Sequence, residues 1–303
     1  MKVLVTGGAG FIGSHIVDVL VEKGYETVVI DNLSTGNKAF LPPEVTFYEV
    51  DISSDSIDNI FKKELPDMVI HQAAQVDVSK SIKQPSVDAL SNIMGTILIL
   101  ETCKKYKVKK FIYASSCSVY GETGDVSIQE LFPIKPISFY GMSKYTPEVY
   151  IKLFNEQFGL PYTILRYANV YGPRQTPKGE GGVVSIFFEK LMNQEPFVIF
   201  GDGHQTRDFV YVKDVAEANV LALQKGKNET INIGTNTKTS INELYSLFGK
   251  VSSSLPTPHY SPSRSGDILY SRLDNRKAFE LLGWKPITTL EQGLVQTYNY
   301  FFS

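Results

Sequence analysis

The 303-residue chain has little of several features that would indicate a particular environment. Only two cysteines occur, Cys103 and Cys117, so a disulfide framework is excluded and no cysteine pair has the spacing of a metal site. No apolar run approaches the roughly 18 residues of a transmembrane helix. The N-terminal MKVLVTGG reaches glycine after a short apolar stretch, whereas a secretory signal needs a longer apolar core. We therefore expect a cytoplasmic protein.

The chain also lacks an excess of charge of either sign. Lys and Arg total 30 and Asp and Glu total 32, for a formal net charge of -2. This balance gives no reason to expect nucleic acid or a membrane surface as a partner. The sequence shows no internal repeat or low-complexity tract. Its length allows one large domain or two modest ones.

What the first half does contain is an alternation of short apolar runs and helix-like segments. Strands are predicted over residues 2–6, 27–30, 45–50, 67–71, 111–114 and 162–167, and helices over 14–23, 57–64, 85–105 and 138–158. Val/Ile runs without strict alternation indicate strands buried on both faces. The pattern predicts an α/β fold with a doubly wound parallel sheet, whose ligand crevice lies at the carboxyl ends of the strands.

The second half is less regular. Residues 171–182 are rich in Gly, Pro and charge and residues 252–265 in Ser and Pro, which is typical of loops. We predict a first domain over residues 1–170, joined by a returning segment at about 208–228. Residues 171–303 are then expected to form a smaller, discontinuous substrate domain.

The stretch TGGAGFIG, residues 6–13, follows the first predicted strand and opens the first helix. Gly7 permits the tight turn, Gly10 lets backbone N–H groups approach a pyrophosphate at the helix N-terminus, and Gly13 allows close helix–strand packing. Asp31 ends the next strand, where its carboxylate can accept hydrogen bonds from an adenosine ribose and would repel a 2′-phosphate. This context predicts a dinucleotide site that favours NAD over NADP.

Tyr140 and Lys144 are four residues apart in the helix predicted over 138–158, so they share one face. A nearby cation favours the phenolate, which can act as a general base or acid. The same spacing is common in exposed helix pairs, so alone it leaves both interpretations open. The glycine loop and the hydroxyl-rich ASSCSVYG, residues 114–121, favour catalysis.

These motifs together resemble the extended short-chain dehydrogenase/reductase family, and most closely the UDP-glucose (UDP-N-acetylglucosamine) 4-epimerases. The resemblance runs nearly end to end and implies a Rossmann sheet with a smaller discontinuous α/β substrate domain. Its motifs are the glycine loop, Asp31-Asn32, Asp51-Ile52, His71-Gln72-Ala73-Ala74, Asn92 with Gly95-Thr96, Ser115-Ser116 with Val119-Tyr120-Gly121, Tyr140 with Lys144, RYANVYGPR (166–174), GDG (201–203) with RDF (207–209), and RSGD (264–267).

The resemblance implies site residues as well as a fold. For NAD they are Gly7, Gly10, Phe11, Ile12, Gly13, Asp31, Asn32, Leu33, Ser34, Thr35, Gly36, Asp51, Ile52, Gln72, Ala73, Ala74, Asn92, Tyr140, Lys144 and Ala168. The catalytic residues would be Tyr140, Lys144 and Ser116, with Ser116 beside Tyr140 at the sugar 4-OH. For a UDP-sugar substrate they are Ser116, Ser118, Tyr140, Asn169, Val183, Phe200, Arg207, Arg264, Asp267 and Ser271. No metal site is expected.

Among the substrate residues, Asn169, Arg207 and Arg264 match the grip on the diphosphate, where an arginine fork donates two hydrogen bonds at fixed charge. Val183 and Phe200 match contacts to the uracil, and Asp267 to its ribose. Without the resemblance, these residues would be interpreted as turn, core or surface.

The reaction implied by the resemblance is 4-epimerisation of a UDP-hexose through a transient 4-keto sugar. Nucleotide-sugar dehydratases and decarboxylases also begin with oxidation at carbon 4, but dehydration needs a further acid–base pair. Relatives of that kind carry acids where this chain has Cys117 and Ser118, so epimerisation is favoured. A non-catalytic NAD-binding protein is less favoured, because Tyr140 and Lys144 are both present.

The sugar is left open. Ser271 stands where some hexose-restricted relatives hold a tyrosine, so UDP-GlcNAc and UDP-GalNAc are possible substrates besides UDP-Glc and UDP-Gal. Relatives acting on UDP-glucuronate carry an arginine near the position of Thr176. The lack of that arginine here argues mildly against a UDP-glucuronate 4-epimerase. The resemblance also implies a homodimer through the helices near 92–106 and 138–158. Pro147 inside the latter predicts a kink costing about 3 kcal/mol, which leaves the dimer geometry open.

Overall fold

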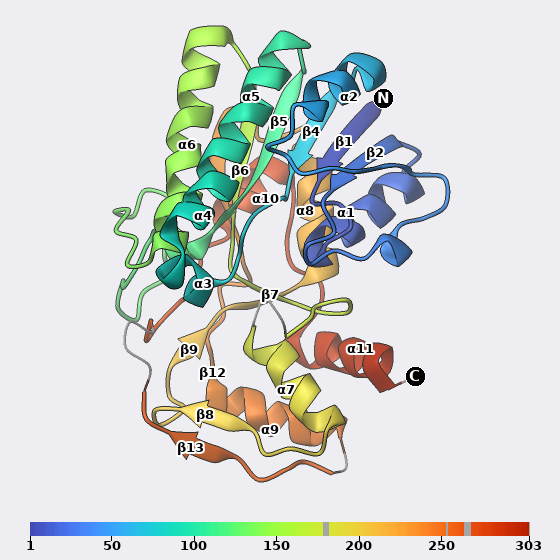
Figure 1. Ribbon diagram of the computed structural model, residues 1–303. Coiled ribbons are helices and arrows are strands. Elements are labelled where there is room, and N and C mark those ends of the chain that lie inside the picture. Colours follow the sequence, from blue (N-terminus) through green and yellow to red (C-terminus); the bar gives the residue numbers. More distant parts are fainter. Residues whose placement is uncertain (178–181, 253, 264–267, 303) are drawn as a thin grey trace.

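The computed structural model describes residues 1–177, 182–252, 254–263 and 268–302. A seven-stranded sheet with the order β11-β6-β5-β4-β1-β2-β3 forms its centre, and every pairing within it is parallel (Figure 1). The strands are β1 (Lys2–Thr6), β2 (Glu26–Asp31), β3 (Thr46–Glu49), β4 (Met68–His71), β5 (Lys110–Ser116), β6 (Tyr162–Tyr167) and β11 (Glu229–Ile233). The predicted doubly wound parallel sheet is therefore confirmed.

Helices cover both faces of this sheet, and a separate hydrophobic cluster fills the space beneath each layer. On one face α1 (Phe11–Glu22), α8 (Val212–Ala222) and α10 (Arg276–Leu282) pack over Val3 and Val5. On the other, α2 (Ser56–Glu64), α5 (Gly95–Lys105) and α6 (Phe139–Phe158) pack over Leu4. Side chains of a strand point alternately to opposite faces, so β1 contributes to both clusters and reads as an unbroken apolar run.

The segment between β4 and α5 differs from the single helix predicted over 85–105. α3 (Val78–Lys83) and α4 (Pro85–Ala89) are followed by a π-helical turn, Leu90–Met94, before α5 begins. The side chain of Asn92, within this turn, bonds to both backbone groups of Gln75 instead of facing outward. A single wider turn of this kind is frequent at functional sites. By contrast, α6 runs from Phe139 to Phe158 as one helix despite Pro147.

The rest of the second half, apart from α8, β11 and α10, forms the lower body in Figure 1. Its helices are α7 (Val183–Met192), α9 (Ile241–Val251) and α11 (Leu290–Phe302). Two short ladders join them, β8 (Val198–Phe200) with β13 (His259–Ser261) and β9 (Thr206–Arg207) with β12 (Thr239–Ser240). Aromatic side chains, among them Phe187, Phe188, Phe197 and Phe248, make its core.

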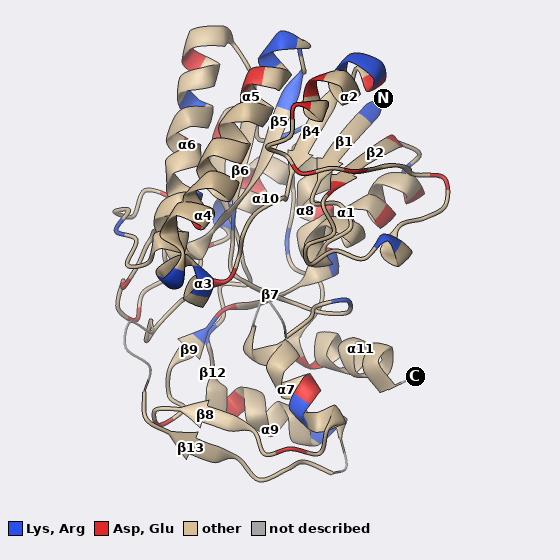
Figure 2. Ribbon diagram, in the orientation of Figure 1, with Lys and Arg blue, Asp and Glu red and all other residues tan. Residues whose placement is uncertain are grey.

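The chain connects the two halves more than once. β7 (Asn169–Tyr171) leaves the sheet and pairs in parallel with β10 (Phe209–Tyr211). α8 then packs against α1, and β11 pairs with β6 at the sheet edge. Lys and Arg are interspersed with Asp and Glu over both bodies (Figure 2). Within the described ranges, none of the helices has the length and apolar character needed to span a membrane.

Candidate active site

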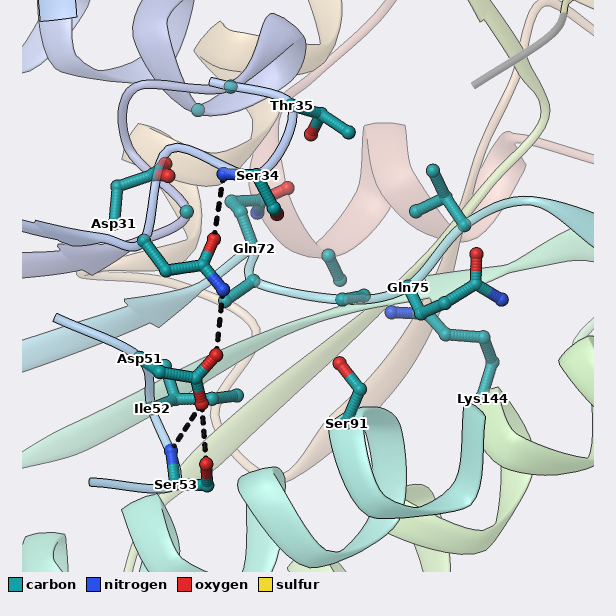
Figure 3. Close-up of a pocket in the computed structure, with 18 of the residues that line it drawn as sticks. Asp31, Ser34, Thr35, Asp51, Ile52, Ser53, Gln72, Gln75, Ser91 and Lys144 are labelled. Carbon is teal, nitrogen blue, oxygen red and sulfur yellow. Dashed lines mark hydrogen bonds between the residues drawn. The ribbon is translucent and has the colours of Figure 1, made fainter. Parts of the chain in front are cut away.

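A cleft of about 700 Å³ lies at the carboxyl ends of the central strands, where the parallel topology places it. Figure 3 shows residues from the loops after β2, β3 and β4 facing one another across this space, with Lys144 of α6 at its other end. Sixteen of the residues expected to bind the cofactor line it: Gly7, Gly10, Phe11, Ile12, Gly13, Asp31, Asn32, Ser34, Thr35, Asp51, Ile52, Gln72, Ala73, Ala74, Tyr140 and Lys144.

The glycine loop forms a tight cradle at one end of the cleft. Gly7 has a φ of +67°, and a Cβ on it would lie 2.6 Å from the backbone nitrogen of Ala73. A Cβ on Gly13 would lie 2.0 Å from the carbonyl oxygen of Gly7, so only glycine permits this approach of helix to loop. Gly10 is the N-cap residue of α1. The N-terminus of a twelve-residue helix thus faces the cleft with its backbone N–H groups and dipole, an arrangement suited to a pyrophosphate.

Asp31 ties the loop after β2 to the glycine loop. Its Oδ2 accepts a hydrogen bond from the Ala9 amide at 2.9 Å and its Oδ1 accepts one from Leu33 at 2.8 Å. Burial raises the pKa of this carboxyl, and the backbone donors partly offset that effect. The acid occupies the end of the second strand, where a ribose-binding carboxylate stands in dinucleotide folds.

Beside Asp31, a chain of hydrogen bonds joins the loops after β2 and β3, which line the cleft. The Asn32 side chain accepts from the Ser34 amide at 3.0 Å and donates to Asp51 at 2.7 Å (Figure 3). Asp51 also accepts from the Ser53 amide at 2.9 Å and hydroxyl at 2.6 Å. Burial opposes ionisation of Asp51, but these hydrogen bonds outweigh it and lower the pKa. Acceptors and short loops here suit the polar edge of an adenosine. The glycine loop, the N-terminus of α1 and the Asp31 carboxylate together fit a dinucleotide.

At the other end of the cleft, Tyr140 and Lys144 project from successive turns of α6. Lys144 is 4% exposed, and its Nζ lies 4.8 Å from the centre of the Tyr113 ring. Burial lowers the pKa of Lys144 to about 8, against the opposing influence of Asp88 and Glu148. A compact ammonium of this kind is still largely charged at neutral pH.

The hydroxyl shelf at the end of β5 is fixed from two sides. Ser115 donates to the Glu148 carboxylate at 2.5 Å, inside the sheet–helix interface. Ser116 Oγ accepts from the Ser118 amide at 3.2 Å and from its hydroxyl at 3.0 Å, capping the short 3-10 turn Cys117–Val119. Ser116 and Ser118 are both half-buried at the mouth of this shelf.

Four residues predicted to bind the cofactor do not line the cleft. Leu33 and Gly36 both lie next to the Asp31 side chain. The Leu33 amide donates to Asp31 Oδ1, and a Cβ on Gly36 would lie 2.9 Å from the same oxygen. Asn92 is buried, with its amide bonded to Gln75. Ala168 is buried beside Gly234.

Of the residues predicted for the substrate, Tyr140 lines this cleft, and the others that the structure describes do not. Asn169 begins β7, and its Oδ1 is buried without a hydrogen-bond partner in the described part of the chain. Val183 begins α7, Phe200 ends β8 and Arg207 ends β9. Ser271 is 7% exposed and its hydroxyl bonds to Cys117. Arg264 and Asp267 lie outside the described residues.

The cleft also contains residues that the sequence analysis missed. Gln75, Asp77 and Lys80 line it from the loop after β4 and from α3. Ser91 and Met94 line it from the π-helical turn. A signal for the first group was present, since HQAAQVD directly follows a predicted strand end. No local pattern marked the second group, because the turn arises from a long-range bond.

Comparisons with known proteins agree with this geometry. A model of the NAD dependent epimerase/dehydratase family matches residues 3–234. The crystal structure of a UDP-glucose 4-epimerase with UDP-glucose from Thermotoga maritima is similar to this chain, with a TM-score of 0.97, 48% identity and 99% and 98% of the two chains covered. The Thermus thermophilus UDP-glucose 4-epimerase complex with NAD has a TM-score of 0.95 and 38% identity, covering 99% of each chain. A UDP-glucose 4-epimerase of Mycolicibacterium smegmatis is 38% identical over 99% of this chain and 98% of its own length.

Proposed function

The chain belongs to the NAD dependent epimerase/dehydratase family, and we propose that within it the protein is an NAD-using 4-epimerase of UDP-hexoses. One observation carries the proposal: the Tyr140–Lys144 pair on α6 lines the same cleft as the glycine loop at the N-terminus of α1. A base and a dinucleotide cradle therefore share one space, as oxidation of a sugar hydroxyl requires. The named relatives support the same activity.

Each part of the site has a task in this reaction. The glycine loop and the first turn of α1 bind the pyrophosphate, and Asp31 accepts hydrogen bonds from the adenosine ribose. When bound, NAD supplies the acceptor and donor of hydride at carbon 4 of the sugar. Tyr140 takes the proton of the 4-OH and later returns it, while the Lys144 ammonium stabilises the phenolate. Ser116 provides a hydroxyl near the same sugar oxygen.

The shelf after β5 supports epimerisation over elimination. Loss of water would require a group that removes the carbon 5 proton and another that expels the 6-OH. Burial raises the pKa of the Cys117 thiol, which therefore stays protonated at neutral pH. Ser118 is a neutral hydroxyl bonded to Ser116. Neither is a base, so the product is expected to have the mass of the substrate.

The test compares the wild-type protein with Tyr140→Phe. The variant is expected to lose conversion of UDP-galactose to UDP-glucose by about a thousandfold or more while retaining its NAD, because only the proton-transfer group is removed. Tyr150→Phe, an exposed tyrosine of the same helix outside the cleft, serves as the control and should keep full activity. Full activity in Tyr140→Phe would overturn the assignment, as would a product lighter by one water.

The preferred sugar is a finer part of the proposal. Ser271 is a small residue where some hexose-restricted relatives hold a tyrosine, so we expect room there for an N-acetyl group at carbon 2. Thr176 stands where an arginine would serve a carboxylated sugar. We expect activity on UDP-Glc/UDP-Gal, activity on UDP-GlcNAc/UDP-GalNAc, and little on UDP-GlcA/UDP-GalA. Assaying the three pairs side by side tests this order.

We also propose a homodimer, located in the cytoplasm. The outer surface of α6 exposes apolar side chains at the positions Phe139, Met142, Val149, Leu153 and Phe158. An unpartnered apolar surface of this extent is typical of an interface. Light scattering after size exclusion tests the dimer, and a monomer at micromolar concentration would contradict it. Both cysteines are free, which suits a reducing compartment.

The division into domains is proposed on the chain path. Residues 1–170, with the returning segment predicted at about 208–228, would form the NAD-binding domain, and the remaining residues of 171–303 the substrate domain. The pairing of β11 with β6 favours extending the returning segment through β11. Limited proteolysis with and without NAD would test this division, since NAD should protect the first domain only.

A further inference from the structure

Asp88 is a buried carboxylate that the reaction described above does not use. It is 1% exposed, in the short helix α4. Its Oδ1 accepts from the Gln75 side chain at 2.8 Å and from the Asn92 side chain at 3.3 Å. Both donors are neutral amides. Placing a carboxylate in the interior with neutral donors alone is costly unless a cation lies nearby.

The network around Asp88 leads directly to the catalytic helix. The same Asn92 amide donates to Ser143 Oγ at 2.9 Å, and Ser143 precedes Lys144 in α6. α4 and the π-helical turn both pack against α6. Gln75, the other donor, lines the cleft. Asp88 is thus fixed between the cleft wall and the turn of α6 that carries the lysine.

Two buried carboxylates act on Lys144, and only one of them is neutralised. Glu148 is 0% exposed and forms a two-pronged ion pair with Arg166. Asp88 has no ion pair among the described residues. Of the two acids, Asp88 raises the pKa of Lys144 more than Glu148 does.

Neither of the buried ionisable groups on the strands near Lys144 supplies a charge in place of the Asp88 carboxylate. Burial lowers the pKa of His71, on β4, to about 3, so this ring is neutral at working pH. Burial raises the pKa of Tyr113, on β5, so it too is neutral. Tyr140 shares α6 with the lysine, and Asp77 and Lys80 line the cleft from the start of α3.

We propose that Asp88 is a positioning residue of the reaction, whose buried and otherwise uncompensated carboxylate keeps Lys144 in its charged form beside Tyr140. The inference rests on the proposed function because it concerns the same site. With Asp88 present, the ammonium persists into the mildly alkaline range and supports the Tyr140 phenolate. Without it, burial alone acts on the lysine and the ammonium is lost at lower pH.

The test uses the holoenzyme, its Asp88→Asn variant, and Ser143→Ala as the matched control, which disturbs the same network but keeps every charge. Titration of Lys144 is followed by NMR of protein carrying 13C-labelled lysine, with the resonance assigned through Lys144→Arg. The midpoint is expected near pH 8 in the wild type and in Ser143→Ala. In Asp88→Asn it should fall by about one pH unit or more.

The pH profile of turnover is the second readout. In Asp88→Asn, kcat should fall about tenfold or more at pH 8.5 and less than about threefold at pH 6.5, with KM for the UDP-sugar nearly unchanged. An unshifted Lys144 midpoint, or an equal shift in Ser143→Ala, would overturn the proposal. If Asp88→Asn does not fold, Asp88→Ser takes its place with the same expectations. The NMR titration needs no turnover, so an inactive wild type would refute the proposed function and leave this test intact.

Discussion

The guanidinium of Arg166 holds the carboxylate of Glu148 through two hydrogen bonds, Nε to Oε1 at 2.9 Å and Nη2 to Oε2 at 2.6 Å. The two side chains are 3% and 0% exposed, and they join β6 to α6 one turn beyond Lys144. Ser115 and Tyr120 bond to the same pair. The helix that carries Tyr140 and Lys144 is therefore joined to the sheet by a buried ion pair.

Breaking this pair is expected to destabilise the protein strongly. Glu148→Ala leaves an unpaired guanidinium in the interior, and we expect a loss of about 3–5 kcal/mol in the free energy of unfolding. Urea denaturation followed by circular dichroism measures it. Asp58→Ala breaks the exposed ion pair with Lys105 and is the control, with a much smaller expected loss because solvent screens the pair. Equal losses in the two variants would contradict this account.

The stability of the protein should depend on the protonation of His71. This ring is 1% exposed between Thr6 and Thr96, and burial lowers its pKa from 6.5 to about 3. The folded state favours the neutral ring. The contribution of this ring to the free energy of unfolding is therefore complete above pH 6.5 and is lost as the pH falls toward 3. The expected slope is about 1.4 kcal/mol per pH unit between pH 6 and 4.

His71→Gln keeps a polar side chain there but does not titrate. Its free energy of unfolding should fall less steeply between pH 6 and 4 than that of the wild type. The two slopes should differ by the uptake of about one proton. His204→Gln, which changes an exposed histidine, is the comparison variant. The prediction fails if the His71 variant retains the full slope in urea denaturation at stepped pH.

Gly13 in the glycine loop and Gly24, which lies between α1 and β2, should respond differently to alanine. Gly13→Ala places a Cβ 2.0 Å from the Gly7 carbonyl oxygen, so the loop must move and the NAD content of purified protein should fall to near zero. At Gly24, where no atom lies within 4 Å of the added Cβ, alanine is strained only by its φ of +76°. Gly24→Ala should retain NAD, with a stability loss of about 1 kcal/mol. Extraction and mass analysis of the nucleotide decide between the outcomes.

Enlarging Ser271 should narrow the range of substrates. The residue is 7% exposed and its hydroxyl bonds to Cys117. A tyrosine would fill the space expected for a 2-N-acetyl group, so Ser271→Tyr should reduce kcat/KM for UDP-GlcNAc by about a hundredfold or more and spare UDP-Glc. Ser271→Ala, which creates no bulk, is the control. Equal losses on both sugars would show that the residue does not select the sugar.

The strands and the dinucleotide loop could be predicted from the sequence because their causes are local. The ranges predicted for β1 and β6 agree with the structure, since buried parallel strands are rich in Val, Ile and Leu. α3 and the π-helical turn could not be, because the turn depends on Asn92 bonding to Gln75, seventeen residues earlier in the chain.

The burial of two charged side chains could not be predicted from the sequence either. Asp88 and Glu148 occur in helical segments of mixed polarity, where an acid is normally solvated. Their burial follows from Gln75, Asn92 and Arg166, which come together only in the fold. The substrate residues were accessible only through the family resemblance, since Asn169 or Phe200 alone indicates a turn or a core position.

The pairing of β11 with β6 has a consequence for how the chain is made. During synthesis β6 emerges early, but Glu229, the first residue of its partner, follows only after β7, α7 and α8 have been translated. Until then the growing sheet ends in an open, apolar edge, which is a template for pairing with other chains. We therefore expect a nascent chain halted before residue 229 to need protection from aggregation that the completed chain does not.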